Sequence, residues 1–137
     1  METVEIKKHA QRTVLALIED MFFAAKLRAV AAELQIELHL ASDGSKFFWT
    51  RESVSPDLII CDLHNARTDP FEFVSRVKRD ERLCRVPLIG FFSHVNIELQ
   101  RRALNEGYDK VLPRSAFTKQ LPQILRGEML IEQSQNT

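Results

Sequence analysis

The sequence predicts an α/β fold, a doubly wound parallel sheet of five strands in the order 2-1-3-4-5 with helices on both faces. Two observations favour it. Short apolar runs alternate along the 137 residues with segments of helical periodicity, and the connections between them are short. Such alternation is typical of parallel sheets covered by helices. Residues 58–61 are apolar without interruption, which is expected of a strand buried on both faces.

The first part of the chain supplies two strands and two helices. Residues 13–18 form an apolar run that is expected to be the first strand. The alanine-rich residues 21–35 carry apolar side chains at helical spacing, which predicts a helix. Residues 36–41 alternate strictly between polar and apolar, which suits a half-buried edge strand. Asp43-Gly44 then predicts a turn, and residues 45–52 a short helix.

A helix separates the third and fourth predicted strands. The third strand, residues 58–61, ends directly on Asp62. Asp69-Pro70 can open the next helix, over residues 70–82, because proline fits the first turn of a helix. Residues 86–92 are apolar again and are expected to form the fourth strand.

The last part of the chain completes the alternation. Residues 96–106 predict a helix that is closed by Gly107, since glycine is common just after a helix. A fifth strand is expected over residues 108–112, and a last short helix over residues 117–125, interrupted by Pro122. The inward side of the helix at 96–106 is expected to carry Leu99, Ala103 and Leu104.

Composition indicates a single domain over residues 12–126, with polar flanks at 1–11 and 127–137. The 19 basic and 19 acidic residues cancel, which argues against binding to nucleic acid or to an anionic membrane. No apolar stretch is long enough for a membrane span, and the N-terminus is not a signal peptide. Cys61 and Cys84 lack the spacing of a metal site or a disulfide framework, so we expect a reduced, cytoplasmic protein.

Carboxylates follow two of the predicted strands. Glu19 and Asp20 come after the first strand, and Asp62 after the third. The carboxyl ends of parallel strands share one edge of the sheet, so these side chains are expected to converge. Two carboxylates about 4 Å apart repel by roughly 4 kcal/mol at an effective dielectric near 20. A core does not need such an arrangement, which points to function; the alternative is that Glu19 and Asp20 only cap a helix.

With these motifs the chain resembles, over residues 12–126, the receiver domain of bacterial two-component response regulators. The resemblance implies a flavodoxin-like receiver fold and a phosphoryl group accepted from a histidine kinase. It also implies a possible homodimer through the fourth helix, fourth loop and fifth strand. The segments that carry it are Glu19-Asp20, Pro56-Asp57-Leu58-Ile59-Ile60-Cys61-Asp62, Val86-Pro87-Leu88-Ile89-Gly90 and Ala103-Leu104-Asn105-Glu106-Gly107-Tyr108-Asp109.

Residue by residue, the resemblance implies roles for the acidic side chains. Asp62 matches the phospho-accepting aspartate, and Glu19 and Asp20 match the acids that hold Mg²⁺. The carbonyl of His64 matches the backbone ligand of the ion. These assignments agree with the chemistry, because an ionised aspartate needs a hard cation to approach an anionic phosphoryl donor. We expect weak Mg²⁺ binding by Asp20 and Asp62, with Glu19 acting through water.

The sequence departs from the receiver pattern where the phosphoryl group is sensed. An ungapped count from Asp62 places Phe92 where the family has a threonine or serine, and Ser93 could supply the hydroxyl only through a shift of one residue. The same count places Arg114 at the lysine that pairs with the phosphoryl oxygen, and Val111 at a switch aromatic. Pro70 replaces a glycine in the loop after Asp62 and stiffens it.

The chain has the acidic residues of the receiver pattern but differs from it at the residues that sense the phosphoryl group. Two functional hypotheses follow from this combination. The first is an atypical single-domain receiver that acts in phosphorelay-type signalling, mainly as a protein-interaction module. The alternative is a competent Mg²⁺-dependent phosphoacceptor of a histidine kinase. Beyond self-phosphotransfer at Asp62, with Arg114 and Ser93 as candidate participants, no enzyme activity is expected. No constellation of residues supports a small-molecule enzyme.

Two further patterns allow either a structural or a contact role. The basic residues between Arg76 and Arg85 form either a solvated helix face or a contact surface for an acidic partner. Phe47, Phe48 and Trp49 follow one another and cannot all face inward from one helix. At least one of these rings is expected to be exposed, either half-buried or in a contact patch.

Overall fold

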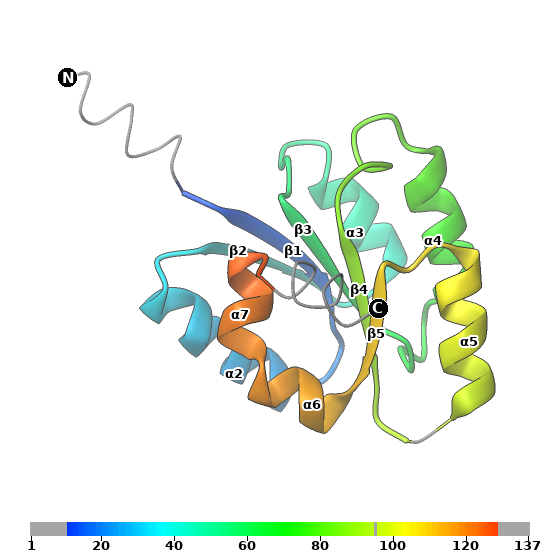
Figure 1. Cartoon of the computed structure of the whole chain (residues 1–137). Coiled ribbons are helices and arrows are strands. Elements are labelled where there is room, and N and C mark those ends of the chain that lie inside the picture. Colours follow the sequence, from blue (N-terminus) through cyan, green and yellow to red (C-terminus); the bar gives the residue numbers. More distant parts are fainter. Residues whose placement is uncertain (1–10, 95, 129–137) are drawn as a thin grey trace.

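The structure, a computed structural model, describes residues 11–94 and 96–128 and contains the predicted five-stranded parallel sheet (Figure 1). The strand order is β2-β1-β3-β4-β5, and every pairing is parallel. The predicted fold class and strand order are therefore confirmed. The strands are β1 (Thr13–Leu17), β2 (Glu37–Ala41), β3 (Leu58–Asp62), β4 (Leu88–Phe92) and β5 (Lys110–Pro113).

Helices cover both faces of the sheet (Figure 1). On one face lie α2 (Met21–Glu33), α6 (Arg114–Lys119) and α7 (Leu121–Arg126). On the other face lie α3 (Gly44–Thr50), α4 (Pro70–Arg79) and α5 (Ile97–Glu106). None of the helices in the described ranges is long and apolar enough to cross a membrane.

Each face of the sheet has its own hydrophobic core. Under α2, α6 and α7, the ring of Phe91 lies with its centroid 4.9 Å from those of Phe23 and Phe117. Under α3 and α4, Phe47 and Phe73 meet edge to face with centroids 4.7 Å apart. Such aromatic contacts add to the apolar area that is removed from water. Cys61 is buried in this second core, as expected.

Several element boundaries differ from those predicted, and each has a local cause. The helix that begins at Pro70 ends at Arg79 because Asp80 is extended and its carboxylate is tied to Arg51 and to the backbone N–H of Arg82. The predicted last helix is two helices, α6 and α7, because Pro122 lacks the N–H that would bond to the preceding turn.

The predicted inward position of Leu104 is wrong, because its side chain is 41% exposed. In α5, Leu99 and Ala103 are four residues apart and face the core together, and Leu104 is turned a further step around the helix. The proposed domain limits and flanks stay predictions. Of the flanks at 1–11 and 127–137, the structure describes only Gln11, Gly127 and Glu128.

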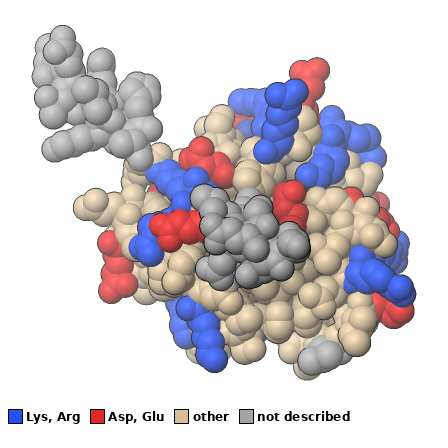
Figure 2. All heavy atoms as spheres, viewed as in Figure 1, with Lys and Arg blue, Asp and Glu red and all other residues tan. Residues whose placement is uncertain are grey.

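Charged side chains are mixed on the surface. Figure 2 shows lysine and arginine side chains in small groups beside aspartate and glutamate, with no continuous field of one sign on the visible face. This matches the balanced composition of the chain. Local surfaces rather than a global field therefore have to provide any recognition of a charged partner.

Candidate functional site

The carboxyl ends of β1 and β3 bring the predicted acidic residues to one edge of the sheet. Leu17 pairs with Cys61 at the end of the two strands, so Glu19, Asp20 and Asp62 all follow at that edge. We call these three residues the acidic cluster. The pKa of Asp62 is raised mainly by burial, and the negative charge of Asp20 adds to the shift. The sequence-based expectation of convergence is therefore met for this pair.

Asp20 accepts three hydrogen bonds through its two carboxylate oxygens. Its Oδ1 accepts from the backbone N–H groups of Phe22 (2.9 Å) and Phe23 (3.2 Å) and so caps α2. Its Oδ2 accepts from Nη2 of Arg114 at 2.8 Å. The Arg114 hydrogen bond is the main reason that the pKa of Asp20 lies below its ordinary value, followed by the Phe23 N–H. Asp20 is thus both a helix cap and a member of the acidic cluster.

Two contacts orient the side chain of Arg114, one with Asp20 and one with Phe23. Besides the bond to Asp20, its guanidinium lies 4.3 Å from the centroid of the Phe23 ring. The chain delivers it there because α6 begins at Arg114, directly after β5. A planar guanidinium against a ring and a carboxylate is more firmly oriented than an ammonium would be. The residue predicted to replace the family's lysine therefore lies at the acidic cluster.

Glu19 binds the loop that follows Asp62. Its Oε1 accepts from the backbone N–H of Ala66 at 3.2 Å, and its Oε2 lies 3.9 Å from Nε of Arg67. Asn65, which sequence reasoning missed, organises the same loop. The Asn65 amide donates to the carbonyl of Ser42 (2.9 Å) and accepts from the N–H of Arg67 (2.8 Å). An asparagine in a polar loop is a known turn signal that could have indicated this role.

Asp62 is half-buried at the end of β3. Its Oδ1 accepts from the backbone N–H of His64 at 2.9 Å. Burial is the largest influence and raises the pKa of Asp62 above its ordinary value, although the His64 N–H and the nearby positive charges oppose the shift. The ring of His64 is exposed and lies 5.9 Å, centroid to centroid, from that of His94.

Phe92 does not face the acidic cluster. Asp62 pairs with Phe91 across β3 and β4, so these two residues point to the same face of the sheet, and Phe92 points to the opposite one. Phe92 is 3% exposed and packs in the core under α3, α4 and α5, together with Val111. The ring of Phe92 therefore lies on the face of the sheet away from Asp62. Ser93 is exposed after the strand, and no hydrogen bond joins it to Asp62.

Pro70, predicted to stiffen the loop after Asp62, is anchored by a residue that sequence reasoning did not single out for this role. Tyr108 is buried, and its hydroxyl donates to the carbonyl of Pro70 at 2.7 Å. The same hydroxyl lies 3.4 Å from Sγ of Cys61. Tyr108 therefore connects the start of α4 to the segment before β5. A buried tyrosine usually has such a partner, so the residue type was the available signal.

In this arrangement the side chains of the acidic cluster do not by themselves form a metal site. Among residues 11–94 and 96–128, no group of three or more histidine, cysteine, aspartate and glutamate side chains is arranged to hold one. Both oxygens of Asp20 are used by α2 and by Arg114, and Glu19 is bound to Ala66. Mg²⁺ takes near-octahedral oxygen ligands, and the guanidinium of Arg114, already bonded to Oδ2 of Asp20, competes with the ion for this carboxylate.

Asp62→Asn is expected to stabilise the protein at neutral pH. Because burial raises the pKa of Asp62, the folded state takes up a proton more readily than the unfolded state. The contribution of Asp62 to the free energy of unfolding therefore falls as the pH rises from the ordinary pKa through the raised one, and asparagine removes this loss. Urea unfolding should show the gain at about pH 7 and little of it at about pH 3. The exposed Glu33→Gln is the control, and an equal gain at both pH values would contradict the argument.

Comparison with known proteins shows a relation in structure only. No protein-family model matches the sequence, and no curated protein matches it. A chemotaxis response regulator of Vibrio cholerae superposes with a TM-score of 0.74 at 18% identity, over 85% of this chain and 99% of the other. The phosphorylated cyanobacterial phytochrome response regulator RcpA gives a TM-score of 0.73 at 21% identity, over 86% and 91%.

A third similar structure is the receiver domain of a sensor histidine kinase from Pseudomonas aeruginosa, described with a magnesium ion coordinated in its active-site cleft. It gives a TM-score of 0.74 at 20% identity, over 85% of this chain and 96% of the other. All three are receivers, so the chain has the receiver fold that the sequence resemblance implied. Identities near 20% establish the fold, and function has to be argued from the site.

Proposed function

We propose that the protein is a receiver-type signalling module that acts mainly through contacts with other proteins, and that phosphorylation of Asp62 is absent or weak. The observation that carries this proposal is the 2.8 Å ion pair between Arg114 and Asp20. It places a fixed positive charge on the carboxylate that a metal-dependent receiver needs free. We propose a histidine kinase or another signalling protein as the partner, and a second copy of the chain as a further one. We propose the cytoplasm as its location.

The chemistry of phosphoryl transfer supports this choice. Catalysis of this reaction rests on positioning and on charges that stabilise the transferred group. Arg114 could supply one such charge, but its guanidinium is already bonded to Asp20 and lies against Phe23. The family's hydroxyl is replaced by Phe92, which is buried on the other face of the sheet. A hydrogen bond to a charged group contributes roughly 1.5 to 3 kcal/mol, and its loss disfavours the phosphorylated state.

One observation favours the alternative, a competent phosphoacceptor. Phe92 packs into the core on the other face of the sheet, so its ring does not lie beside Asp62. The next residue, Ser93, is exposed. A small backbone change at the end of β4 would allow Ser93 to replace the missing hydroxyl. Weak Mg²⁺ binding by Asp20 and Asp62, with Glu19 acting through water, stays a prediction under both functions, and the bond from Arg114 to Asp20 competes with it.

Labelling with acetyl phosphate separates the two functions. With millimolar Mg²⁺, acid-quenched intact mass spectrometry should find far less than one phosphoryl group per chain in the natural protein, and none in Asp62→Asn. Arg114→Lys should raise the labelled fraction, because a compact ammonium gives up Asp20 more readily than a fixed guanidinium. Full labelling of the natural protein that is lost in Asp62→Asn would overturn the proposal and establish the phosphoacceptor.

A further inference from the structure

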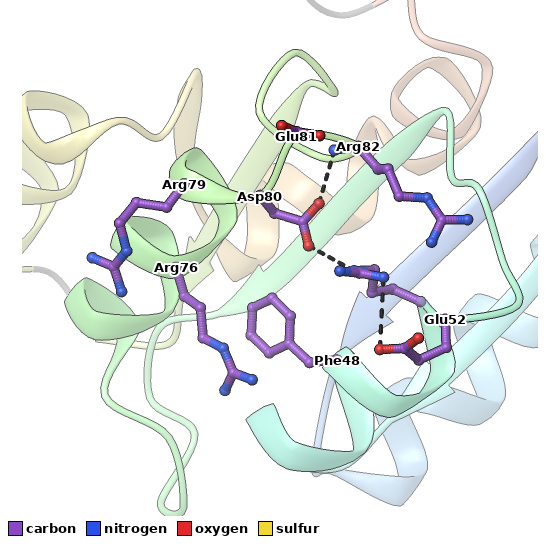
Figure 3. A pocket seen from close by; sticks show the side chains of 8 residues that line it. Phe48, Glu52, Arg76, Arg79, Asp80, Glu81 and Arg82 are labelled. Atoms are coloured by element: carbon purple, nitrogen blue, oxygen red, sulfur yellow. Dashed lines mark hydrogen bonds and ion pairs between the residues drawn. The ribbon is translucent and has the colours of Figure 1, made fainter.

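A groove lies over α3 and α4 and contains none of the acidic cluster (Figure 3). It consists of two adjoining hollows of about 510 and 540 Å³ that share Phe48, Glu52 and Arg76. We call it the α3–α4 groove. The first hollow extends to Arg82, after α4, and the second to Trp49, on α3.

An ion pair forms a fixed part of the groove wall. Nε of Arg51 lies 2.6 Å from Oδ2 of Asp80, and Nη1 of Arg51 lies 3.7 Å from Glu52. The other oxygen of Asp80 accepts from the backbone N–H of Arg82. The charge of Arg51 is therefore satisfied within the protein, and the pair holds the end of α3 against the end of α4.

Three other arginines line the groove, Arg76, Arg79 and Arg82, and none has a carboxylate partner among the described residues. Arg79 donates to the hydroxyl of Ser75. Figure 3 shows Arg76 on one side of Asp80 and Arg82 on the other. Arg76 and Arg82 are both exposed, and neither is within ion-pair distance of an acidic side chain in residues 11–94 and 96–128. The guanidinium of Arg76 lies 4.0 Å from the centroid of the Phe48 ring, which orients it and leaves its N–H groups for an outside acceptor.

An exposed aromatic side chain lies next to these charges. Trp49 is 79% exposed, although it follows two buried phenylalanines in the same helix. Tryptophan and arginine are the residue types most enriched among the energetic anchors of protein interfaces. The groove therefore offers apolar contact area and uncompensated positive charge side by side.

From these contacts we propose that the α3–α4 groove binds an acidic peptide segment of a partner protein, one that carries apolar side chains between its carboxylates. Arg76 and Arg82 receive the carboxylates, and Trp49 with the edge of Phe48 receives the apolar side chain. Glu52, Asp80 and Glu81 also line the groove, so the ligand's negative charges have to lie at the arginines and away from these acids. Carboxylates spaced along a peptide can meet this condition more easily than one compact phosphate. Two extended hollows with separated cations match charges that are spaced along a peptide.

This inference deepens the proposed role in protein contacts by assigning one surface and the chemistry of its partner. It does not depend on Asp62, whose carboxylate lies outside the groove. Asp62→Asn should consequently bind the peptide as the natural protein does. Loss of peptide binding would leave the labelling result unaffected, so the two proposals fail separately.

The test uses the intrinsic fluorescence of Trp49, the only tryptophan of the chain. The probe is the peptide Glu-Glu-Phe-Glu-Glu-Phe-Glu-Glu, which has no fluorescence of its own at the tryptophan wavelength. Titration into the full chain at low salt should change the emission in a saturable way. Binding should weaken at about 0.5 M salt, because exposed charge pairs are screened. The double variant Arg76→Glu with Arg82→Glu should bind about tenfold more weakly.

Matched controls determine the interpretation. Arg28→Glu makes the same kind of charge change on the exposed side of α2, across the sheet, and should leave affinity unchanged. The peptide with glutamine in place of glutamate should not bind, and far-UV circular dichroism should show the double variant folded. Equal affinity of the double variant and Arg28→Glu would overturn the proposal. Saturable binding of inorganic triphosphate but not of the peptide would also overturn it, in favour of a phosphate site.

Discussion

Phe91→Ala is expected to lower the free energy of unfolding by about 3 to 5 kcal/mol, the usual cost of removing a buried phenyl ring. Phe91 is 1% exposed and lies between Phe23 and Phe117, with both centroid distances at 4.9 Å. The loss combines apolar area returned to water with a cavity that two neighbouring rings cannot fill. Urea unfolding followed by circular dichroism measures it.

The same substitution should also affect the acidic cluster. Phe23 contacts both the guanidinium of Arg114 and the ring of Phe91. A cavity at Phe91 therefore loosens the support that holds Arg114 on Asp20. The control is Phe22→Ala, since Phe22 is 90% exposed and should cost less than about 0.5 kcal/mol. A loss below about 1 kcal/mol for Phe91→Ala would show that this core repacks around the gap.

The fold could be predicted because the local signals agree with one another. The apolar run at 58–61 became β3 in the centre of the sheet, and the alternating residues 36–41 gave the edge strand β2. Asp69-Pro70 and Gly107 mark helix ends, as observed for α4 and α5. Boundaries were less predictable where tertiary contacts decide them. Asp80 ends α4 by pairing with Arg51, 29 residues away in sequence, and no local pattern contains that information.

The candidate site could be located from the sequence but not described in detail. The predicted strand ends placed Asp20 and Asp62 at one edge of the sheet, where the structure has them. The resemblance to receivers predicted Arg114 for the same site, and its side chain bonds to Asp20. The direction of Phe92 could not be predicted, because the face of a strand residue depends on where pairing ends. The hydrogen bond from Arg114 to Asp20 could not be predicted either. The conformation of the long Arg114 side chain depends on its contact with the Phe23 ring, which is a tertiary contact.

The α3–α4 groove shows the same division between local and tertiary information. The sequence indicated a basic segment after residue 75 and a surplus aromatic among residues 47–49, and Trp49 is the exposed one. Only the packing of α3 beside α4 shows that both patterns line one groove. The contact between Arg76 and Phe48 joins them.

Arg51→Ala is expected to destabilise the protein by about 2 to 3 kcal/mol, between the values for exposed and fully buried ion pairs. The Arg51 side chain is 21% exposed and that of Asp80 only 9%. Removal of the arginine leaves the Asp80 carboxylate mostly buried without its cation. The backbone N–H of Arg82 would be its remaining strong partner. Arg28→Ala, an exposed arginine on α2, is the control and should have little effect.

The destabilisation should depend on pH in a definite direction. Burial alone would raise the pKa of Asp80, but the N–H of Arg82 and the side chain of Arg51 lower it below its ordinary value of 3.8. A lowered pKa in the folded state gives stability that is complete above the ordinary pKa and is lost as the pH falls through the lowered one. Without Arg51, burial dominates and the contribution disappears. Urea unfolding should therefore show the full difference between Arg51→Ala and the natural protein at about pH 7, and a much smaller one at about pH 3. A difference that stays constant over this range would mean that Arg51 acts through packing rather than through its charge on Asp80.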